Sequence, residues 1–133
     1  YSTGQSAVLV ASGSEVAADN DITLHATQLP RYSFGFAIVS RTQGFIPSPT
    51  GPGFLCINGQ IGRFVAPSQI KNSGSAGAFD LDVDLMRIPT PTGFVSTVAG
   101  DTWNFQVWYR DVTPPPSAFA FSHVTSGVEV VFQ

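Results

Sequence analysis

The sequence predicts an all-β protein, an antiparallel β-sandwich that is jelly-roll-like and has about eight strands. Val, Ile, Phe and Thr recur in short runs separated by Gly and Pro, which is typical of strands and turns. No segment repeats its apolar residues with the period of a helix. The turn signals are fairly evenly spaced, and 133 residues suit one domain, so we expect a single β-sandwich domain over residues 1–133.

The first third of the chain predicts three strands, over residues 6–12, 21–29 and 32–41. The second alternates Ile22, Leu24 and Ala26 with polar side chains, so one of its faces is core and the other is wet. The third places large residues on one face, namely Tyr32, Phe34, Phe36 and Ile38. The opposite face carries small residues, namely Gly35, Ala37 and Val39. We expect another layer or strand to approach this small face closely.

The middle of the chain is richer in turns. Residues 42–53 contain Pro and Gly and predict a loop. Residues 54–65 predict one or two short strands around Asn58-Gly59, a dipeptide that favours tight hairpins. Residues 67–77 are polar and glycine-rich, which again indicates a loop.

Two strong strand patterns follow, over residues 78–85 and 100–111. The first alternates Phe79, Leu81, Val83 and Leu85 with three aspartates, and a Pro-rich turn at 87–93 separates the two. The second has aromatic and apolar residues on one face, namely Trp103, Phe105, Val107 and Tyr109. Its other face carries Asn104, Gln106, Trp108 and Arg110. Because both faces hold large side chains, we expect this strand to be central.

The chain closes with a proline run, Pro114 to Pro116, an edge strand over 117–123 and a last strand over 127–133. The alternation of all these segments predicts one shared core. Its members are Trp103, Phe105, Phe79, Leu81, Ile22 and Leu24.

Composition narrows the function. Only 11% of residues are charged, Lys71 is the sole lysine and the net charge is −3, which excludes the clustered basic face of a nucleic-acid-binding protein. No apolar run approaches the roughly 20 residues that span a bilayer. A surface of uncharged polar residues is common on exported proteins and repels neighbours weakly, so we expect self-association. The chain starts at Tyr1 and reads as a processed mature chain or an excised module, secreted or at the cell surface.

Metal and cofactor chemistry has little support in the sequence, and we expect no cofactor. Asp80, Asp82 and Asp84 lie along one strand face, where they cannot curl around a calcium ion, so we expect them to face water. The turn Asp19–Asp21 has a better shape for calcium, but turn and cap chemistry explains it equally well, and both readings stay open. Cys56 has no partner for a disulfide or a metal and is interpreted as a small buried hydrophobe.

Catalysis is not predicted. The two histidines, His25 and His123, stand beside no Ser or Cys nucleophile in the sequence, and His25 points outward on its strand. A carboxylate pair for glycoside hydrolysis remains open, because such partners meet only in the fold. Sugar rings stack on exposed aromatic residues, and Trp108 with Tyr109 is the candidate ligand-binding pair, although a loop or second sheet covering Trp108 is the simpler expectation. We expect Arg63 and Arg110 to anchor loops.

A resemblance adds to this reading. Residues 100–111 read Gly-Asp-Thr-Trp-Asn-Phe-Gln-x-Trp-Tyr-Arg-Asp, and upstream pieces at 40–45, 54–64 and 69–74 are similar in the same order. Together they resemble a β-rich module of large exported bacterial proteins, a family with no assigned activity. The resemblance implies export and an accessory or structural role. The proline run and the longer tail depart from the pattern.

We therefore expect a non-catalytic extracellular structural module. It either assembles with copies of itself, as a filament or surface-layer subunit, or tethers a larger surface protein. A carbohydrate-binding module with a polysaccharide partner is the alternative. Both ends of the chain are alternating apolar strands, over residues 1–12 and 127–133, and exchange of one of them between copies is one route to assembly. Completion of the chain's own sheets is the other outcome.

Overall fold

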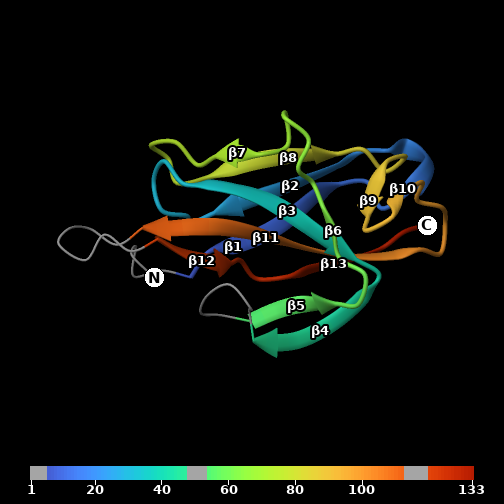
Figure 1. Cartoon of the computed structure of the whole chain (residues 1–133). Helices are drawn as coiled ribbons and strands as arrows, with labels where there is room; N and C mark the ends of the chain where they lie inside the picture. Colours follow the sequence, from blue (N-terminus) through green and yellow to red (C-terminus); the bar gives the residue numbers. More distant parts are fainter. Residues whose placement is uncertain (1–5, 48–53, 113–119) are drawn as a thin grey trace.

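The structure is a computed structural model, and it describes residues 6–47, 54–112 and 120–133 (Figure 1). The described residues form thirteen strands and one short 3-10 helix, η1 (Ala17–Asp19). In chain order the strands are β1 (Val8–Gly13), β2 (Ile22–Thr27), β3 (Phe34–Ser40), β4 (Thr42–Pro47), β5 (Phe54–Asn58), β6 (Gly62–Arg63), β7 (Lys71–Asn72), β8 (Phe79–Val83), β9 (Ile88–Thr90), β10 (Gly93–Val95), β11 (Thr102–Val112), β12 (Ala120–Val124) and β13 (Val128–Val131). No helix in these ranges is long and apolar enough to cross a membrane.

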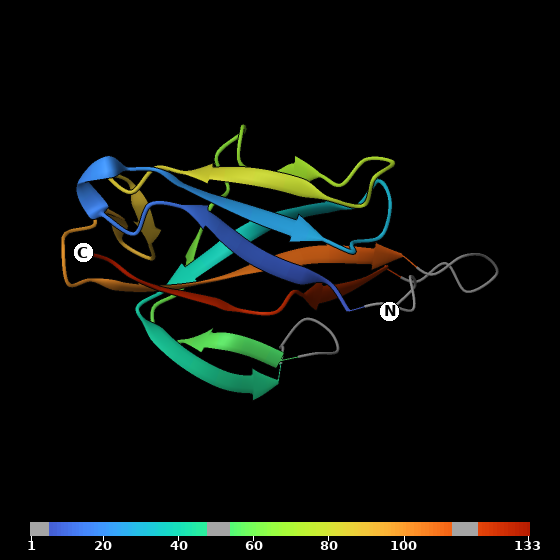
Figure 2. The same cartoon turned by 180° about the vertical axis from the view of Figure 1, so that it is seen from behind.

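Two antiparallel sheets form the body of the molecule. The small sheet has the order β1-β2-β8. The large sheet has six strands: it runs β12-β11-β3-β6, with β13 also paired to β11 and β7 to β3. The sheets lie one over the other (Figures 1 and 2), and their inner faces share one hydrophobic core. The prediction of an antiparallel sandwich is confirmed. The strand count exceeds eight because the structure also contains short strands and two separate hairpins, β4–β5 and β9–β10, in addition to the longer strands of the two sheets.

Strand β11 is the centre of the large sheet, as predicted. β3 pairs along one side of it, and β12 and β13 pair along the other. The inward side chains are all buried, namely Trp103, Phe105, Val107 and Tyr109. Five of the six predicted core residues are buried together, and Phe79 packs against them half-buried.

Strand β3 shows why one of its faces is small. Ala37 and Val39 point into the main core and are fully buried. A Cβ added at Gly35 would lie 2.7 Å from the carbonyl oxygen of Trp108, so a larger residue would push β3 and β11 apart. The predicted close approach is confirmed, and the aromatic face of β3 looks away from the core.

Three predictions about the middle of the chain were wrong. Residues 42–47 form strand β4 instead of a loop, and they pair with β5 through a register shift (the rest of the predicted loop, residues 48–53, lies outside the described residues). The Asn58-Gly59 turn does not close a hairpin, because β5 pairs with β4 while β6 pairs with β3. The predicted turn at 87–93 contains β9, which forms a small hairpin with β10. At Asn58-Gly59 the two flanking strands take different partners, whereas β9 and β10 pair with each other across a two-residue turn.

The two ends of the chain are tied to each other. The Ser126 N–H donates to the Ala7 carbonyl, and the Leu9 N–H donates to Ser126 Oγ. At the far end of β1, the backbone of Gln133 accepts from Ala17 and donates to Glu15. Within this chain β1 pairs with β2, and β13 pairs with β11. Residues 1–5, the proline run and residues 117–119 lie outside the described residues.

Candidate functional site

The outer face of the large sheet, which points away from the main core, is divided into two halves. β3 and β11 supply both halves, and their facing pairs in order along the sheet are Ser40–Asn104, Ile38–Gln106 and Phe36–Trp108. The β4–β5 hairpin lies over the half that starts at Ser40 (Figure 1), and it forms a second hydrophobic cluster with Ile38. We call this the covered half. The half that extends past Phe36 toward Phe34 and Arg110 is the open half.

Gln106 fastens the hairpin to the sheet. Its side chain is fully buried, and its Oε1 accepts the Cys56 N–H at 3.0 Å. Its Nε2 donates to the carbonyls of Phe54, at 3.1 Å, and Thr125, at 2.7 Å. The side-chain amide therefore forms hydrogen bonds with the backbone edge of β5, as a neighbouring strand would. The buried amide oxygen and nitrogen both have hydrogen-bond partners.

Ser40 and Asn104 complete this clamp at the hairpin base. Asn104 Nδ2 donates to the Ser40 carbonyl at 3.2 Å, and Ser40 Oγ donates to the Asn58 carbonyl at the end of β5. The Thr42 N–H in turn donates to Ser40 Oγ at 3.1 Å. The polar residues that alternate with the core aromatics of β11 thus hold a second layer in place.

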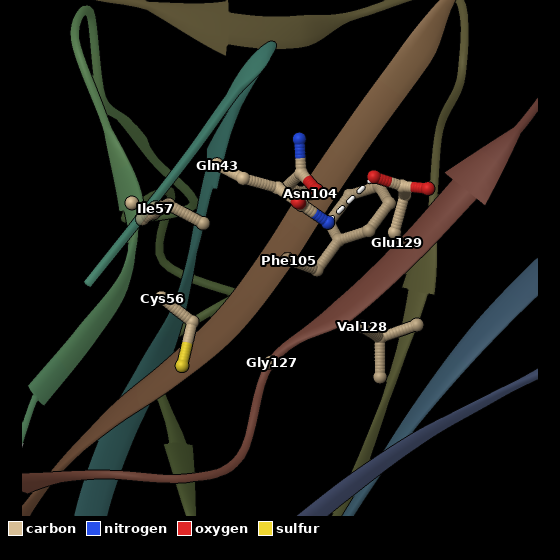
Figure 3. Close-up of a pocket in the computed structure, with 9 residues that line it drawn as sticks. Gln43, Cys56, Ile57, Asn104, Phe105, Gly127, Val128 and Glu129 are labelled. Atoms are coloured by element: carbon tan, nitrogen blue, oxygen red, sulfur yellow. Dashed lines mark hydrogen bonds between the residues drawn. The ribbon is translucent and has the colours of Figure 1, made fainter.

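A hollow of about 260 Å³ lies between the hairpin and the β11–β13 edge (Figure 3). Gln43 Nε2 donates to Glu129 Oε2 at 2.6 Å across its rim, and Cys56 lies on its wall. Cys56 is half-buried, so its predicted burial is only partial. A reactive thiolate needs a neighbouring cation or base, whereas the charged lining residue is Glu129. This hollow fits a packing joint better than a catalytic centre.

Arg41 and Asp101 lie beyond the Ser40–Asn104 pair, at the same end of β3 and β11. Arg41 Nη1 lies 3.1 Å from Asp101 Oδ1, and its guanidinium stacks 4.3 Å from the ring centre of Trp103. The Val98 N–H donates to Asp101 Oδ2 at 2.9 Å. This backbone hydrogen bond and then Arg41 hold the pKa of Asp101 below its usual value, so the carboxylate is ionised and fixed at neutral pH. The sequence did not reveal this anchor, because its two partners lie 60 positions apart.

The open half carries a second hollow, of about 290 Å³, which we call the Tyr32 hollow. Its lining residues are Pro30, Arg31, Tyr32, Ser33, Phe34 and Arg110. The rings of Tyr32 and Phe34 are 68% and 60% exposed. Ser33 is buried and its Oγ donates to the Arg110 carbonyl, which joins the loop before β3 to the end of β11. A rigid backbone thus presents aromatic and cationic side chains to solvent.

A Ser–His–Asp chain lies on the solvent-facing side of the small sheet. Ser12 Oγ is 2.6 Å from His25 Nε2, and His25 Nδ1 is 2.7 Å from Asp80 Oδ1. This is the connectivity of a hydrolase triad, and it is not visible in the sequence because three separate strands supply the residues. Acyl transfer also needs oxyanion donors and a site for the acyl group, yet these three residues lie on an open sheet face and line neither hollow. The geometry fits a cross-strand network better than a catalytic site.

Asp82 in β8 and Asp84 just after it also have side-chain partners on other segments. Asp82 accepts from Thr23 Oγ1 at 2.8 Å, and Asp84 accepts from Asn20 Nδ2 at 3.2 Å. Asn20 in turn accepts the Leu85 N–H through its Oδ1, so the Asp19–Asp21 turn serves to join two strands. Among the residues that the structure describes, no three His, Cys, Asp or Glu side chains gather as metal ligands would.

The two predicted ligand-binding residues lie in different environments. Tyr109 is 1% exposed and stacks on His123 at 5.9 Å inside the sandwich, so its ring is not accessible to a sugar. Trp108 is half-buried, with its ring centre 5.1 Å from that of Phe36. Arg63 and Arg110 form no ion pair within the described ranges, so the expected anchoring to a carboxylate is not seen there. The exposed aromatics Tyr32 and Phe34 were missed, because the alternation of β3 did not say which face was core.

Comparison of the chain with protein-family models, with curated proteins and with solved structures finds no match.

Proposed function

We propose that the chain is a non-catalytic structural module of an exported protein, secreted or at the cell surface, and that it associates with copies of itself through the β4–β5 hairpin. The observation that carries this is an exposed aromatic pair at the hairpin tip. Phe45 and Phe54 stack at 4.3 Å with their planes 8° apart, although Phe45 is 74% exposed. Ile46 beside them is also exposed, which makes an apolar patch of the kind found at protein interfaces.

The hairpin also offers a strand edge. Because Gln106 occupies the backbone of β5, β4 is the outer strand, and β5 is its one strand partner in the described residues. Residues 42–47 contain no charged side chain that would repel a second strand. Antiparallel pairing of two β4 strands about a two-fold axis would satisfy both edges and cover both aromatic pairs.

The low charge of the chain favours such contacts. With 11% charged residues and a net charge of −3, electrostatic repulsion between copies is weak. Pro47 and the register shift in β4 limit the length of the edge that can pair with a second β4 strand. We therefore expect a dimer to form first, and any larger assembly to be built from that dimer.

Sedimentation velocity over a concentration series tests the proposal. The unmodified chain should sediment as a dimer or a larger particle at high concentration, and the double variant Phe45→Ser, Phe54→Ser should sediment as a monomer. Phe94→Ser is the matched control, since Phe94 is an exposed phenylalanine, intermediate in exposure between Phe45 and Phe54, and is remote in sequence from the hairpin. Circular dichroism should show that all three chains are folded. A monomeric unmodified chain, or equal loss of association in the control, would contradict the proposal.

A further inference from the structure

The backbone of Tyr32, at the Tyr32 hollow, has a strained conformation. Tyr32 has φ +55°, in the left-handed region where a bulky side chain is rare and costs free energy. Its N–H donates to the Gly74 carbonyl at 3.0 Å, which holds the backbone in this state. The Tyr32 side chain is exposed, and it lines the hollow together with Phe34.

The charge of the hollow is opposite to that of the chain. Arg31 and Arg110 are two of six basic residues in a chain of net charge −3, and none of the described residues that line the hollow is acidic. Neither guanidinium forms an ion pair within the part of the chain that the structure describes. Guanidinium groups bind carboxylates and phosphates in a two-pronged geometry, so the charge of the hollow favours an anionic ligand of this kind.

The aromatic faces narrow the class of anion. The face of an aromatic ring carries negative charge density and accepts the polarised C–H groups of a sugar ring. A hollow of about 290 Å³ is at the small end of ligand sites, which suits one or two sugar units of a longer chain that continues into solvent. Tyr109 pairs with Gly35 across the β3–β11 ladder, and the next residue of each strand, Arg110 and Phe34, lines the same hollow, so a carboxylate on a stacked sugar can reach the Arg110 guanidinium.

We infer that the Tyr32 hollow binds a uronic acid unit of an acidic polysaccharide, with Phe34 and Tyr32 stacking on the sugar and Arg31 and Arg110 binding its carboxylate. The binding site lies apart from the hairpin patch. Binding and self-association are therefore separable properties.

Polygalacturonate is the probe, and affinity electrophoresis in gels at 0.15 M salt is the measurement, with dextran as the neutral polymer. The unmodified chain should be retarded by polygalacturonate and not by dextran. Arg110→Gln and Phe34→Ser should each weaken the retardation at least tenfold. Absence of retardation, or equal retardation by dextran, would overturn the inference.

The chain supplies a matched control in a second exposed arginine and phenylalanine pair. Arg87 lies 4.2 Å from the ring centre of Phe94, outside the Tyr32 hollow. Arg87→Gln and Phe94→Ser remove the same chemistry there and should leave the retardation unchanged. If Arg87→Gln weakens it as much as Arg110→Gln does, binding is a general charge effect and the inference is wrong.

Tyr32→Gly separates binding from folding. Glycine tolerates φ +55°, so the variant should melt no lower than the unmodified chain while its binding to polygalacturonate falls. Unchanged binding in this variant would remove Tyr32 from the site and overturn the stacking role assigned to it.

Discussion

The two halves of the outer sheet face are built from the same two strands and differ in what their side chains do. In the covered half, Gln106 and Asn104 are buried and bond to the backbone of the hairpin and its neighbours. In the open half, Phe34 and Arg110 stand in solvent and no side-chain hydrogen bond or ion pair within the described residues involves either. Four positions along β11, from Gln106 past Trp108 to Arg110, separate the half of the face that holds the hairpin from the half that is open to solvent.

The difference between the two halves shows that the outward-facing residues of β11 have two roles, one structural and one on the solvent-exposed surface. A buried amide is costly unless every polar atom finds a partner, so Gln106 is constrained by the hairpin above it. An exposed phenylalanine or arginine is not needed to satisfy buried polar groups, so its side chain is available to contact a ligand. Stability should therefore depend on the covered half, and binding on the open half.

The largest expected effect follows from removing the clamp. Gln106→Leu keeps the approximate volume but leaves the Cys56 N–H and the carbonyls of Phe54 and Thr125 without their partner. We expect a loss of about 3 kcal/mol in the free energy of unfolding, from several buried groups at about 1–3 kcal/mol each. Urea denaturation measures it. Gln43→Leu, which removes the exposed bond to Glu129, is the control and should cost less than about 1 kcal/mol.

A loss below about 1 kcal/mol for Gln106→Leu would mean that water replaces the clamp and that the covered half is no more constrained than the open one.

The second effect has the opposite sign and lies in the open half. Tyr32→Gly should raise the free energy of unfolding by about 1 kcal/mol, because it relieves the left-handed strain and the exposed ring packs on little. Glycine also increases the entropy of the unfolded chain, which limits the gain. Thermal unfolding measures it. A clear decrease in melting temperature would show that the ring supports the fold and is not held for a ligand.

The third effect is a dependence of the free energy of unfolding on pH, caused by His123, which is buried beneath the open half. Burial lowers the pKa of His123, partly opposed by Asp111, whose Oδ2 lies 3.8 Å from His123 Nε2. The unfolded chain therefore binds the His123 proton at higher pH than the folded chain does. The stability contribution is complete above the ordinary histidine pKa of about 6.5 and is lost as pH falls through the lower folded value.

Urea denaturation between pH 7.5 and pH 5 should show this loss, and His123→Gln should reduce it. Unchanged pH dependence in that variant would assign the effect to another group.

The smallest expected effect concerns the Ser12–His25–Asp80 chain. Asp80→Asn should change stability by less than about 0.5 kcal/mol, since exposed pairs contribute little. We expect Ser12 to remain unlabelled by a fluorophosphonate that marks activated serines. Stoichiometric labelling of Ser12 that disappears in Asp80→Asn would show that this network is a catalytic triad.

Much of the fold could be predicted from local pattern. The period-two alternation of residues 22–26, 79–85 and 103–109 sets which side chains share a face, and those sets do form the core. The hairpins could not be predicted in the same way. Asn58-Gly59 has the right local chemistry for a hairpin, yet the pairing of β5 with β4 depends on Gln106, which lies about 50 positions away.

The candidate functional surface was even harder to predict from the sequence than the hairpins were. Trp108 and Tyr109 are neighbours in sequence but point to opposite faces of β11, and burial of one face removes Tyr109 from solvent. Ser12, His25 and Asp80 meet only because β1, β2 and β8 align in one sheet.

The sequence by itself determined the β class, the two-faced strands and the residues of the main core, because alternation and turn chemistry act over a few residues and do not depend on the partner. Only the tertiary structure decided which face of β3 is covered, how β11 clamps the hairpin, and where Tyr32, Phe34, Arg31 and Arg110 meet. These depend on contacts between distant segments, whose free energies appear only when the sheets have assembled.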